Sequence, residues 1–248
     1  SAQRMNACRL YVAGGEYGGC RHKVEVYIPL TDTWTLTPDP PVVVYDANSE
    51  ILEDGRVLQA MVYGTGKNTV IYDPSTNTYA TGPSSLDYFD ESAWVKLPDG
   101  SILYVDVTFG AGGDDKSTER YIPATNTWIA DANAPVSLYD PYGYESGGAF
   151  LLPDGRAFFI GALGHTAYYT PSGSTSNGTW ATGPDIPSAQ GTPDAAGAML
   201  VNGKILCAVS PIPTSGNHLP SPTAFYEFDY LTNTFTQVGA PGGGTTNA

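Results

Sequence analysis

Basic residues, cysteine and long apolar runs are scarce in this 248-residue chain. Eleven Lys and Arg stand against 25 Asp and Glu, which gives a formal net charge of −14. A surface that follows nucleic-acid phosphates or an anionic membrane needs clustered Lys and Arg, so neither is an expected partner. No apolar run approaches the roughly 20 residues that cross a bilayer, and we expect no membrane insertion. Low lysine with abundant Thr, Tyr and Gly resembles a secreted protein, so we expect an extracellular location.

Turn-forming and β-forming residues are abundant instead. The chain holds 29 Gly, 20 Pro and 17 Tyr, a composition typical of an all-β protein with many turns. Its 41% hydrophobic residues suffice for a buried core and argue against global disorder.

One phrase recurs five times along the chain. Its copies run from Tyr27 to Trp34, Tyr72 to Tyr79, Tyr121 to Trp128, Tyr169 to Trp180 and Phe228 to Phe235, the fourth being degraded. An Asp-Gly or Asn-Gly pair precedes four of them, at Asp54-Gly55, Asp99-Gly100, Asp154-Gly155 and Asn202-Gly203. The residues that follow each turn, at 9, 56, 101, 156 and 204, lie 45 to 55 residues apart. The chain is therefore an array of five repeats.

Each repeat predicts four short antiparallel strands. An apolar strand leads into the Asp-Gly turn, which suits a type I′ hairpin, and a second apolar strand follows. After a variable loop, the third strand ends near Tyr-x-Pro, and Thr-Asn turns the chain into the fourth. We expect an all-β fold, a β-propeller of five four-stranded antiparallel blades. The predicted propeller covers 1–240, with a flexible tail at 241–248, and its blades lie at about 1–45, 46–89, 90–144, 145–194 and 195–240.

The same phrases carry a family resemblance. The pair Gly14-Gly15, the Tyr-x-Pro and the Thr-Asn-Thr-Trp are similar to kelch repeats. The segments Val12 to Tyr17, Leu152 to Arg156 and Gly161 to Thr166 resemble the secreted galactose-oxidase-like kelch proteins of bacteria and fungi. Such relatives usually have six or seven blades. The chain then either closes a five-blade ring or forms part of a larger propeller, with further blades or domains of a longer chain.

Blade topology sorts the connections into two faces. The turns between strands one and two, and between three and four, lie on one side, here called the turn face. The loops between strands two and three, and the crossings between blades, lie on the other side, the loop face. Irregular loops held by a rigid scaffold carry function more often than regular turns do. We therefore expect the site on the loop face.

Acidic residues recur where crossings enter the first strands. Asp46, Glu91, Glu145 and Asp194 precede the post-turn residue by 10 or 11 positions. We expect their carboxyl groups to converge at the mouth of the channel, with Glu16 and Asp106 adding to them. Such a ring would hold a hard cation such as Ca²⁺ or hydrogen-bond sugar hydroxyls. The alternative is that these acids accept backbone N–H groups and hold adjacent blades together.

Aromatic and histidine side chains in the loop-face segments are further candidates. Exposed rings there could stack on a sugar. The candidate loop residues are Tyr17, Tyr63, Tyr144, His165 and His218, and Phe109, Tyr139 and Tyr142 are further aromatic candidates.

The resemblance also offers an enzymatic alternative. The copper-radical oxidases of this fold, galactose and glyoxal oxidases, need two His and two Tyr ligands and a Cys–Tyr crosslink. Here the histidines are His22, His165 and His218, acids occupy the crossings, and Cys20 follows a second strand, so this pattern argues against copper. Glycoside cleavage by two carboxylates is a further alternative, although no pair is assigned. We favour a non-catalytic propeller that binds a glycan, a cation or a protein through its acidic loop face.

The three cysteines fit no zinc pattern. Cys8 and Cys20 lie at opposite ends of a predicted strand, about 20 Å apart at roughly 3.3 Å per residue. A disulfide allows only about 4.4–6.8 Å between Cα atoms, so we expect no Cys8–Cys20 bridge. Cys207 falls within a strand and is expected to be buried and inert.

Overall fold

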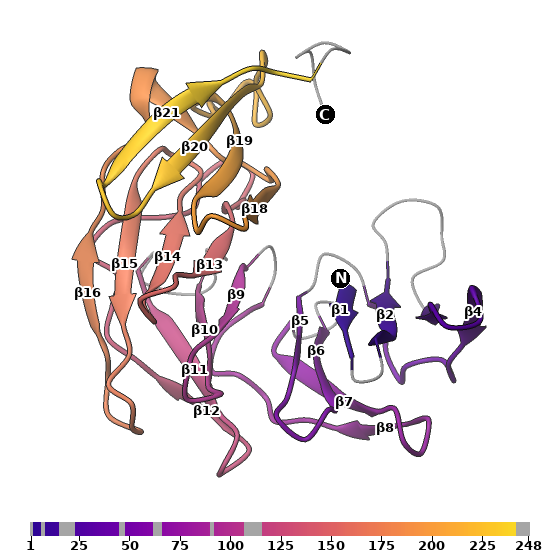
Figure 1. Cartoon of the computed structure of the whole chain (residues 1–248). Helices are drawn as coiled ribbons and strands as arrows, with labels where there is room; N and C mark the ends of the chain where they lie inside the picture. The colour runs from indigo at the N-terminus through magenta and orange to yellow at the C-terminus, as the bar shows by residue number, and fades with distance from the viewer. Residues whose placement is uncertain are drawn as a thin grey trace.

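The computed structural model describes residues 2–5, 8–14, 23–44, 48–61, 66–89, 92–106 and 116–241. They form five antiparallel sheets, the blades, joined in chain order (Figure 1). The expected all-β propeller of five blades is confirmed. Within the described part of the chain no helix could cross a membrane, and the helix η2 (Pro187–Ala189) is a three-residue 3₁₀ helix.

The strands of each blade follow one another in sequence. Blade 1 holds β1 (Ala2–Arg4), β2 (Leu10–Ala13), β3 (Val24–Ile28) and β4 (Thr33–Leu36). Blade 2 holds β5 (Ser49–Ile51), β6 (Val57–Met61), β7 (Asn68–Asp73) and β8 (Thr78–Thr81). Blade 3 holds β9 (Trp94–Lys96), β10 (Ile102–Val105), β11 (Thr118–Ile122) and β12 (Thr127–Ala130). Blade 4 holds β13 (Ala149–Leu151), β14 (Ala157–Ile160), β15 (Thr166–Thr170) and β16 (Thr179–Thr182). Blade 5 holds β17 (Gln190–Gly191), β18 (Gly197–Met199), β19 (Ile205–Pro211), β20 (Ala224–Asp229) and β21 (Thr234–Val238).

The first strands form the inner side of the propeller. β1 contacts β5, β5 contacts β9, and β9 contacts β13, so neighbouring blades approach one another at these strands. In blade 5 both β17 and β18 pair with β19, which lengthens the inner edge of that sheet.

The Asp-Gly turns differ in type from the expectation. Gly55 has a φ of +87°, while Asp54 is not among the residues with positive φ, so the turn is not type I′. Leu52 N donates to Arg56 O and Gly55 N donates to Leu52 O, which is a three-residue loop closed by a left-handed glycine. Asp54 Oδ1 accepts the N–H of Arg56, two residues on. The same Asx contact recurs at Asp99, Asp154 and Asn202, and it explains why this position holds only Asp or Asn.

The Tyr and Asn of the repeat phrase bind each other. Tyr72 donates its hydroxyl to Asn77 Oδ1 at 2.9 Å, and Asn77 sits in the left-handed region at φ +56°. The equivalent bonds join Tyr27 to Asp32 and Tyr121 to Asn126. In blade 5 the tyrosine is replaced by phenylalanine, and Asn233 instead accepts from Tyr168 of blade 4. In blades 1, 2 and 3 this hydrogen bond therefore holds the turn between the third and fourth strands in shape.

Each blade has two unlike faces. The side that carries the third-strand ring (Tyr27, Tyr72, Tyr121, Tyr169 or Phe228) is here called the aromatic face, and the other side is the reverse face. Four hydrophobic clusters join the reverse face of one blade to the aromatic face of the next. The cluster between blades 2 and 3, for example, packs Leu58 and Ile71 against Tyr121 and Trp128.

A buried ion pair of blade 3 also binds the long turn of blade 4. Arg120, whose side chain is fully buried, donates from Nε to Asp131 Oδ2 at 2.8 Å. Its other two nitrogens donate to the carbonyl oxygens of Ser174 and Ser176 at 2.8 and 2.7 Å. Those serines belong to the turn between β15 and β16, which is longer than the corresponding turns of the other blades.

Cys207 matches the expectation, whereas the absence of a Cys8–Cys20 bridge stays a prediction. Cys8 is an exposed free thiol, and Cys20 lies outside the described residues. Cys207 is buried in β19, where burial raises the pKa of its thiol to about 12. Such a thiol stays protonated at neutral pH and is a poor nucleophile.

Candidate functional site

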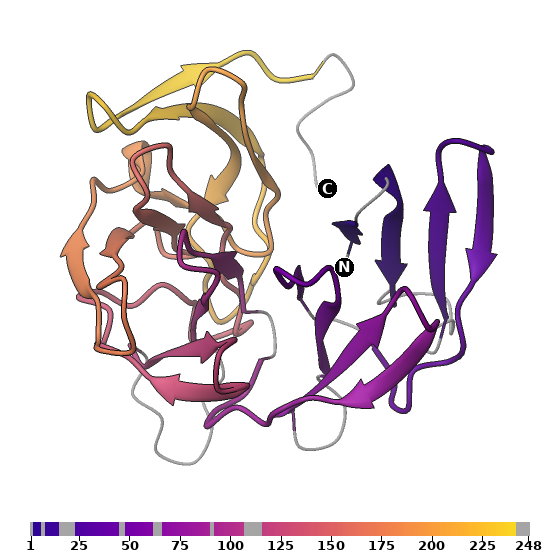
Figure 2. The same ribbon diagram turned by 60° about the horizontal axis from the view of Figure 1, so that its bottom comes forward.

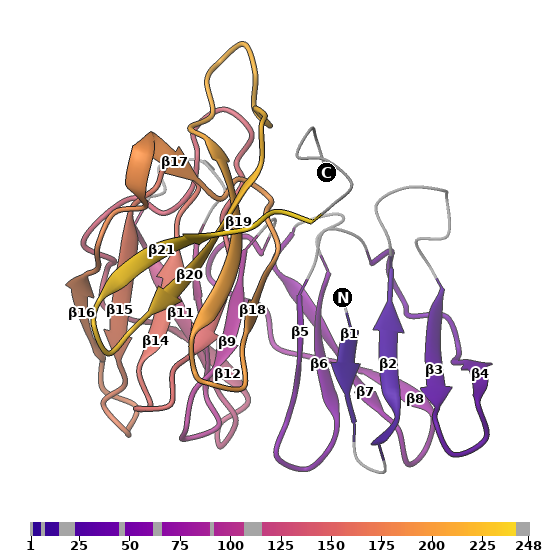
Figure 3. The same cartoon turned by 45° about the horizontal axis from the view of Figure 1, so that its top comes forward.

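The two faces of the propeller differ as expected. In Figure 3 the hairpin ends β3–β4 and β5–β6 lie at the bottom, on the turn face. The loop between β19 and β20 projects from the top, on the loop face. The candidate site is built from this loop and from the crossing between blades 3 and 4.

A short hairpin in that crossing is held by one carboxylate. Tyr139 and Ser146 form an isolated antiparallel bridge, and Asp140 N donates to Glu145 O. Asp140 is fully buried, and its Oδ1 accepts the N–H groups of Tyr142 and Gly143 at 2.8 and 2.7 Å. Its Oδ2 accepts the N–H of Glu145 at 3.3 Å. The 139–146 hairpin is therefore fixed in shape before any ligand arrives.

This hairpin presents two exposed rings beside a histidine from blade 5. Tyr142 and Tyr144 are 42% and 44% exposed. The Tyr142 ring lies nearly parallel to that of His218, with 6.4 Å between centroids and 24° between planes. Tyr144 has a φ of +62°, a left-handed conformation that a residue with a side chain adopts only when its surroundings hold it there.

Gly143 marks where the hairpin and the β19–β20 loop meet. A Cβ placed on Gly143 would lie 3.1 Å from Asp140 Oδ2, 3.2 Å from Glu145 Cγ and 3.5 Å from His218 Cβ. The side chains of Glu145 and His218 therefore both lie close to this glycine. Two predicted candidates, Glu145 and His218, are thus brought together, His218 stacks on Tyr142, and Tyr144 is the residue before Glu145 in the hairpin. We call these four side chains the loop-face cluster.

Half of the expected acidic ring falls within the described chain. Glu145 is half-buried and lies in the loop-face cluster, and Asp194 is exposed in a turn at φ +46°. Asp106 is buried at the end of β10, where Ser117 donates to it at 3.3 Å. Glu16, Asp46 and Glu91 lie outside the described residues, so convergence of the ring stays a prediction.

The remaining candidates are dispersed. His165 lies at the start of β15, where its Nδ1 is 2.9 Å from Asp185 Oδ1. Tyr139 was expected to be exposed, but it is 5% exposed and packs in the interior. Tyr17, Tyr63 and Phe109 lie outside the described residues.

The described donors do not fit the copper site of the oxidases in the resemblance. His165 is bonded to Asp185 in blade 4, whereas His218 stacks on Tyr142 in a loop of blade 5. Within the described ranges, no three His, Cys, Asp or Glu side chains are grouped as metal ligands would be. We therefore derive no chemistry through copper.

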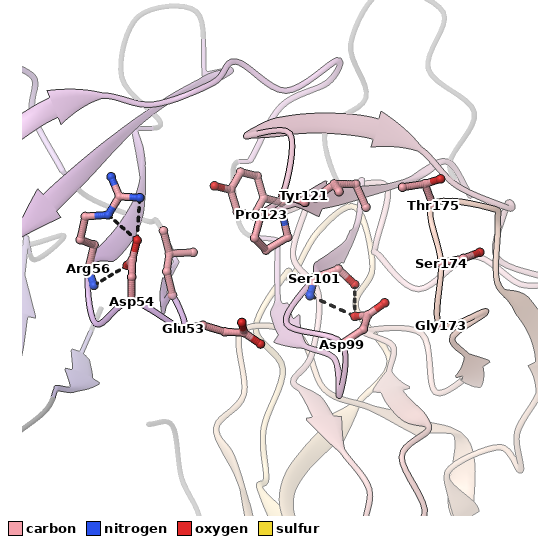
Figure 4. Close-up of a pocket in the computed structure, with 13 residues that line it drawn as sticks. Glu53, Asp54, Arg56, Asp99, Ser101, Tyr121, Pro123, Gly173, Ser174 and Thr175 are labelled. Carbon is pink, nitrogen blue, oxygen red and sulfur yellow. Dashed lines mark hydrogen bonds and ion pairs between the residues drawn. The ribbon is translucent and has the colours of Figure 1, made fainter.

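A hollow of about 480 Å³ lies on the turn face, where the sequence predicted only structural turns (Figure 4). It lies between the turns of blades 2 and 3 and the long turn of blade 4, around Glu53, Asp99, Pro123 and Ser174. Several of its polar groups bind one another rather than face the hollow freely. Asp54 pairs with Arg56, Asp99 accepts from Ser101, and the Ser174 carbonyl accepts from Arg120. This makes the hollow a weaker candidate than the loop-face cluster.

Comparisons with known proteins agree with this fold. A family model described as the Kelch motif matches residues 7–41. Comparison with proteins of curated function gave no match. Among solved structures, the chain matches one titled "Novel fungal alcohol oxidase with catalytic diversity among the AA5 family, in complex with copper". That match has a TM-score of 0.69 and 14% identity, and it covers 96% of this chain and 52% of the other.

The described chain is a five-blade β-propeller in which residues 7–41 match the Kelch motif. It shares this fold with the copper-bound fungal alcohol oxidase. At 14% identity this likeness concerns the fold alone, and the chain spans about half the length of that oxidase.

Proposed function

We propose that this propeller is a non-catalytic, extracellular binding module that holds a glycan at the loop-face cluster. The observation that carries the proposal is the position of an exposed ring, Tyr142, stacked on His218, with the half-buried carboxylate side chain of Glu145 close to the same histidine. Aromatic faces cover the apolar face of a sugar ring, and a carboxylate accepts its hydroxyl protons. A fixed hairpin lowers the entropy lost on binding.

The same cluster supports binding better than catalysis. Glycoside cleavage requires two carboxyl groups, one acting as acid. The acid nearest to Gly143 besides Glu145 is Asp140, whose two oxygens accept three backbone N–H groups and which solvent does not reach. Asp140 therefore stabilises the hairpin and is not placed to act as a catalytic acid.

Binding of defined soluble oligosaccharides by isothermal titration calorimetry, after a glycan-array screen, tests this proposal. We expect Tyr142→Ala and Glu145→Gln each to weaken binding about tenfold or more, since central interface residues cost over 1 kcal/mol when truncated. Gly143→Ala should also weaken binding, because its Cβ crowds Glu145 and His218. Trp34→Ala is the matched control: it removes an exposed ring from blade 1 and should leave affinity unchanged.

Two outcomes would count against the proposal. One is a screen with no bound glycan from a folded, monodisperse sample. The other is a bound glycan whose affinity is the same in the Tyr142 and Glu145 variants, which would move the site elsewhere on the chain. A protein partner or a cation would show itself as binding that free oligosaccharide does not displace, or that chelator abolishes.

A further inference from the structure

The turn between β15 and β16 carries an acceptor sequence for an N-linked glycan. Asn177, Gly178 and Thr179 form the pattern Asn-x-Thr, with a middle residue other than proline. No other Asn in the 248-residue sequence has Ser or Thr two positions after it. Modified Asn residues of this pattern lie on the surface of secreted proteins. Exposure of the Asn side chain, and its freedom from other hydrogen bonds, therefore decide whether the pattern can be used.

In the other blades, the Asn of the repeat phrase is held by a tyrosine hydroxyl. Asn77 and Asn126 each accept the hydroxyl of their own phrase tyrosine at 2.9 Å, and their φ angles are +56° and +53°. Asn233 accepts the Tyr168 hydroxyl at 2.7 Å and has a φ of +59°. An aromatic residue stands two positions after each of them, which excludes the acceptor pattern. Here the Asn belongs to the turn itself.

One additional glycine releases the Asn in blade 4. Gly178 separates Asn177 from Thr179, whereas in the other blades the Asn stands directly before the Thr. Gly178 N donates to Asp131 Oδ1 at 2.9 Å and to the Tyr169 hydroxyl at 3.1 Å, and that hydroxyl donates to Asp131 Oδ2 at 3.0 Å. The phrase tyrosine is therefore occupied, and Asn177 is not among the residues with positive φ. Its side chain forms no hydrogen bond within the described chain.

The backbone around Asn177 is anchored while its side chain stays in solvent. Asn177 and Thr179 are exposed, and Gly178 between them is buried. A Cβ on Gly178 would overlap the hydroxyl of the phrase tyrosine, so glycine is needed at this place. The carbonyl of Ser176, on the other side of Asn177, accepts from the buried Arg120 at 2.7 Å. The fold therefore presents the Asn amide and the Thr hydroxyl together at the surface.

This surface is remote from the loop-face cluster. Residues 173–175 of the same turn line the hollow on the turn face. β16, which begins at Thr179, is the outer strand of blade 4 and lies on the outside of the arc of blades (Figure 2). A bulky glycan attached here extends into solvent and leaves the loop face open to a ligand.

We propose that Asn177 carries an N-linked glycan. The inference rests on the extracellular location in the proposed function, because this modification belongs to secreted proteins. The donor is a lipid-linked oligosaccharyl diphosphate, and a transferase of the secretory pathway catalyses the step. Asn177 Nδ2 forms a bond to C1 of the first sugar while the bond between C1 and the diphosphate oxygen breaks. The lipid diphosphate leaves with the electron pair of that bond, and Nδ2 loses one proton to a base of the transferase.

Peptide mass spectrometry tests the site on the full chain, taken from its natural source and from a eukaryotic cell that secretes it. We expect one oligosaccharide on the peptide that contains Asn177, and peptide N-glycosidase should remove it and leave an aspartate. Asn177→Gln and Thr179→Ala should each abolish the modification, whereas Thr179→Ser keeps the hydroxyl and should retain it. Ser176→Ala is the matched control, because it removes a hydroxyl of the same turn outside the acceptor pattern. It should leave the modification unchanged.

Each variant changes an exposed side chain, so its thermal midpoint should match that of the parent without glycan, which separates loss of the acceptor from misfolding. An extracellular, folded chain with unmodified Asn177 overturns the glycan and leaves the proposed binding function standing. Sugar that survives Thr179→Ala and resists peptide N-glycosidase assigns the modification to hydroxyl groups of the turn and overturns it as well. A chain that stays inside the cells of its natural source, with Asn177 unmodified, overturns both the glycan and the extracellular location.

Discussion

At the residue scale, the buried charged side chains carry a large desolvation penalty on folding, which their hydrogen bonds must offset. Asp131 is enclosed in the interior, and its two oxygens accept from Arg120, Tyr169, Ala132 and Gly178. Glu119 shows the same device: it accepts the N–H groups of Leu86 and Asp87 and the Tyr104 hydroxyl, and burial raises the pKa of its carboxyl. Carboxylates therefore tie crossings and long turns to the blades here, which is the structural role considered for the acidic ring.

Removing one member of the Arg120–Asp131 pair should be severe. Asp131→Ala removes the carboxylate that lies 2.8 Å from the buried guanidinium and leaves that of Asp99 at 3.6 Å, and we expect a loss of about 3–5 kcal/mol of unfolding free energy. The double variant Arg120→Met with Asp131→Leu removes both charges and should lose less than Asp131→Ala alone. Urea denaturation measures both. A double variant at least as unstable as the single one would mean that Arg120 contributes mainly through the Ser174 and Ser176 carbonyls.

At the scale of the element, the repeat phrase recurs in all five blades, and its environment decides how much each copy contributes to stability. Trp128 lies in a cluster with Phe89, Trp94 and Tyr104, with ring centroids 5.1 to 5.4 Å away. Trp34 occupies the same place in β4, but among the described rings it stacks on Tyr27 alone, at 5.0 Å between centroids.

This matched pair gives a prediction within one chain. Trp128→Ala should cost about 3–5 kcal/mol, as for large buried aromatics. Trp34→Ala should cost under about 1 kcal/mol, since the removed ring is mostly in water. Chemical denaturation of the two variants checks the difference. Equal costs would show that the blade 1 face is covered in solution.

The strands and turns were predictable because their signals are local and repeated. Asp54 with Gly55, and Asn77 with its Tyr72 partner, act within a few residues of themselves. The turn type was wrong because only the glycine, and not the Asp before it, has positive φ. An Asp-Gly pair occurs both in two-residue type I′ turns and in three-residue loops closed by a left-handed glycine, so the dipeptide alone does not distinguish them.

The candidate site was predictable only in part, because its members meet across blades. Glu145 and His218 are 73 positions apart, and only the fold brings them to Gly143. Asp140 was missed, although Asp140-Pro-Tyr-Gly143 carries a turn signal that predicts an Asx cap. Arg120 looks like a surface residue in its strand, but it is fully buried and donates to carbonyl oxygens of the long turn of blade 4.

At the scale of the whole molecule, the excess of acid sets the response to ions. A net charge of −14 means that carboxylates repel one another across the surface in the compact state. Screening by salt weakens this repulsion, since the Debye length falls from about 10 Å at 0.1 M to about 3 Å at 1 M. Salt should therefore stabilise the protein whatever the role of the ring Asp46, Glu91, Glu145 and Asp194.

Thermal melts in NaCl and in CaCl₂ distinguish general charge screening from Ca²⁺ binding at the expected acidic ring. Thermal melts in NaCl should rise smoothly with ionic strength and level off. If the four ring acids hold Ca²⁺, millimolar CaCl₂ should raise the midpoint above that of NaCl at equal ionic strength, because a ligand that binds only the folded state stabilises it by mass action. Asp46→Asn with Glu91→Gln should remove the excess and keep the NaCl response. Asp154→Asn with Asp229→Asn, acids of the turn face, serve as the charge-matched control. Identical melts in the two salts at equal ionic strength would contradict a cation ring and leave these acids as ties between blades, as Glu119 is.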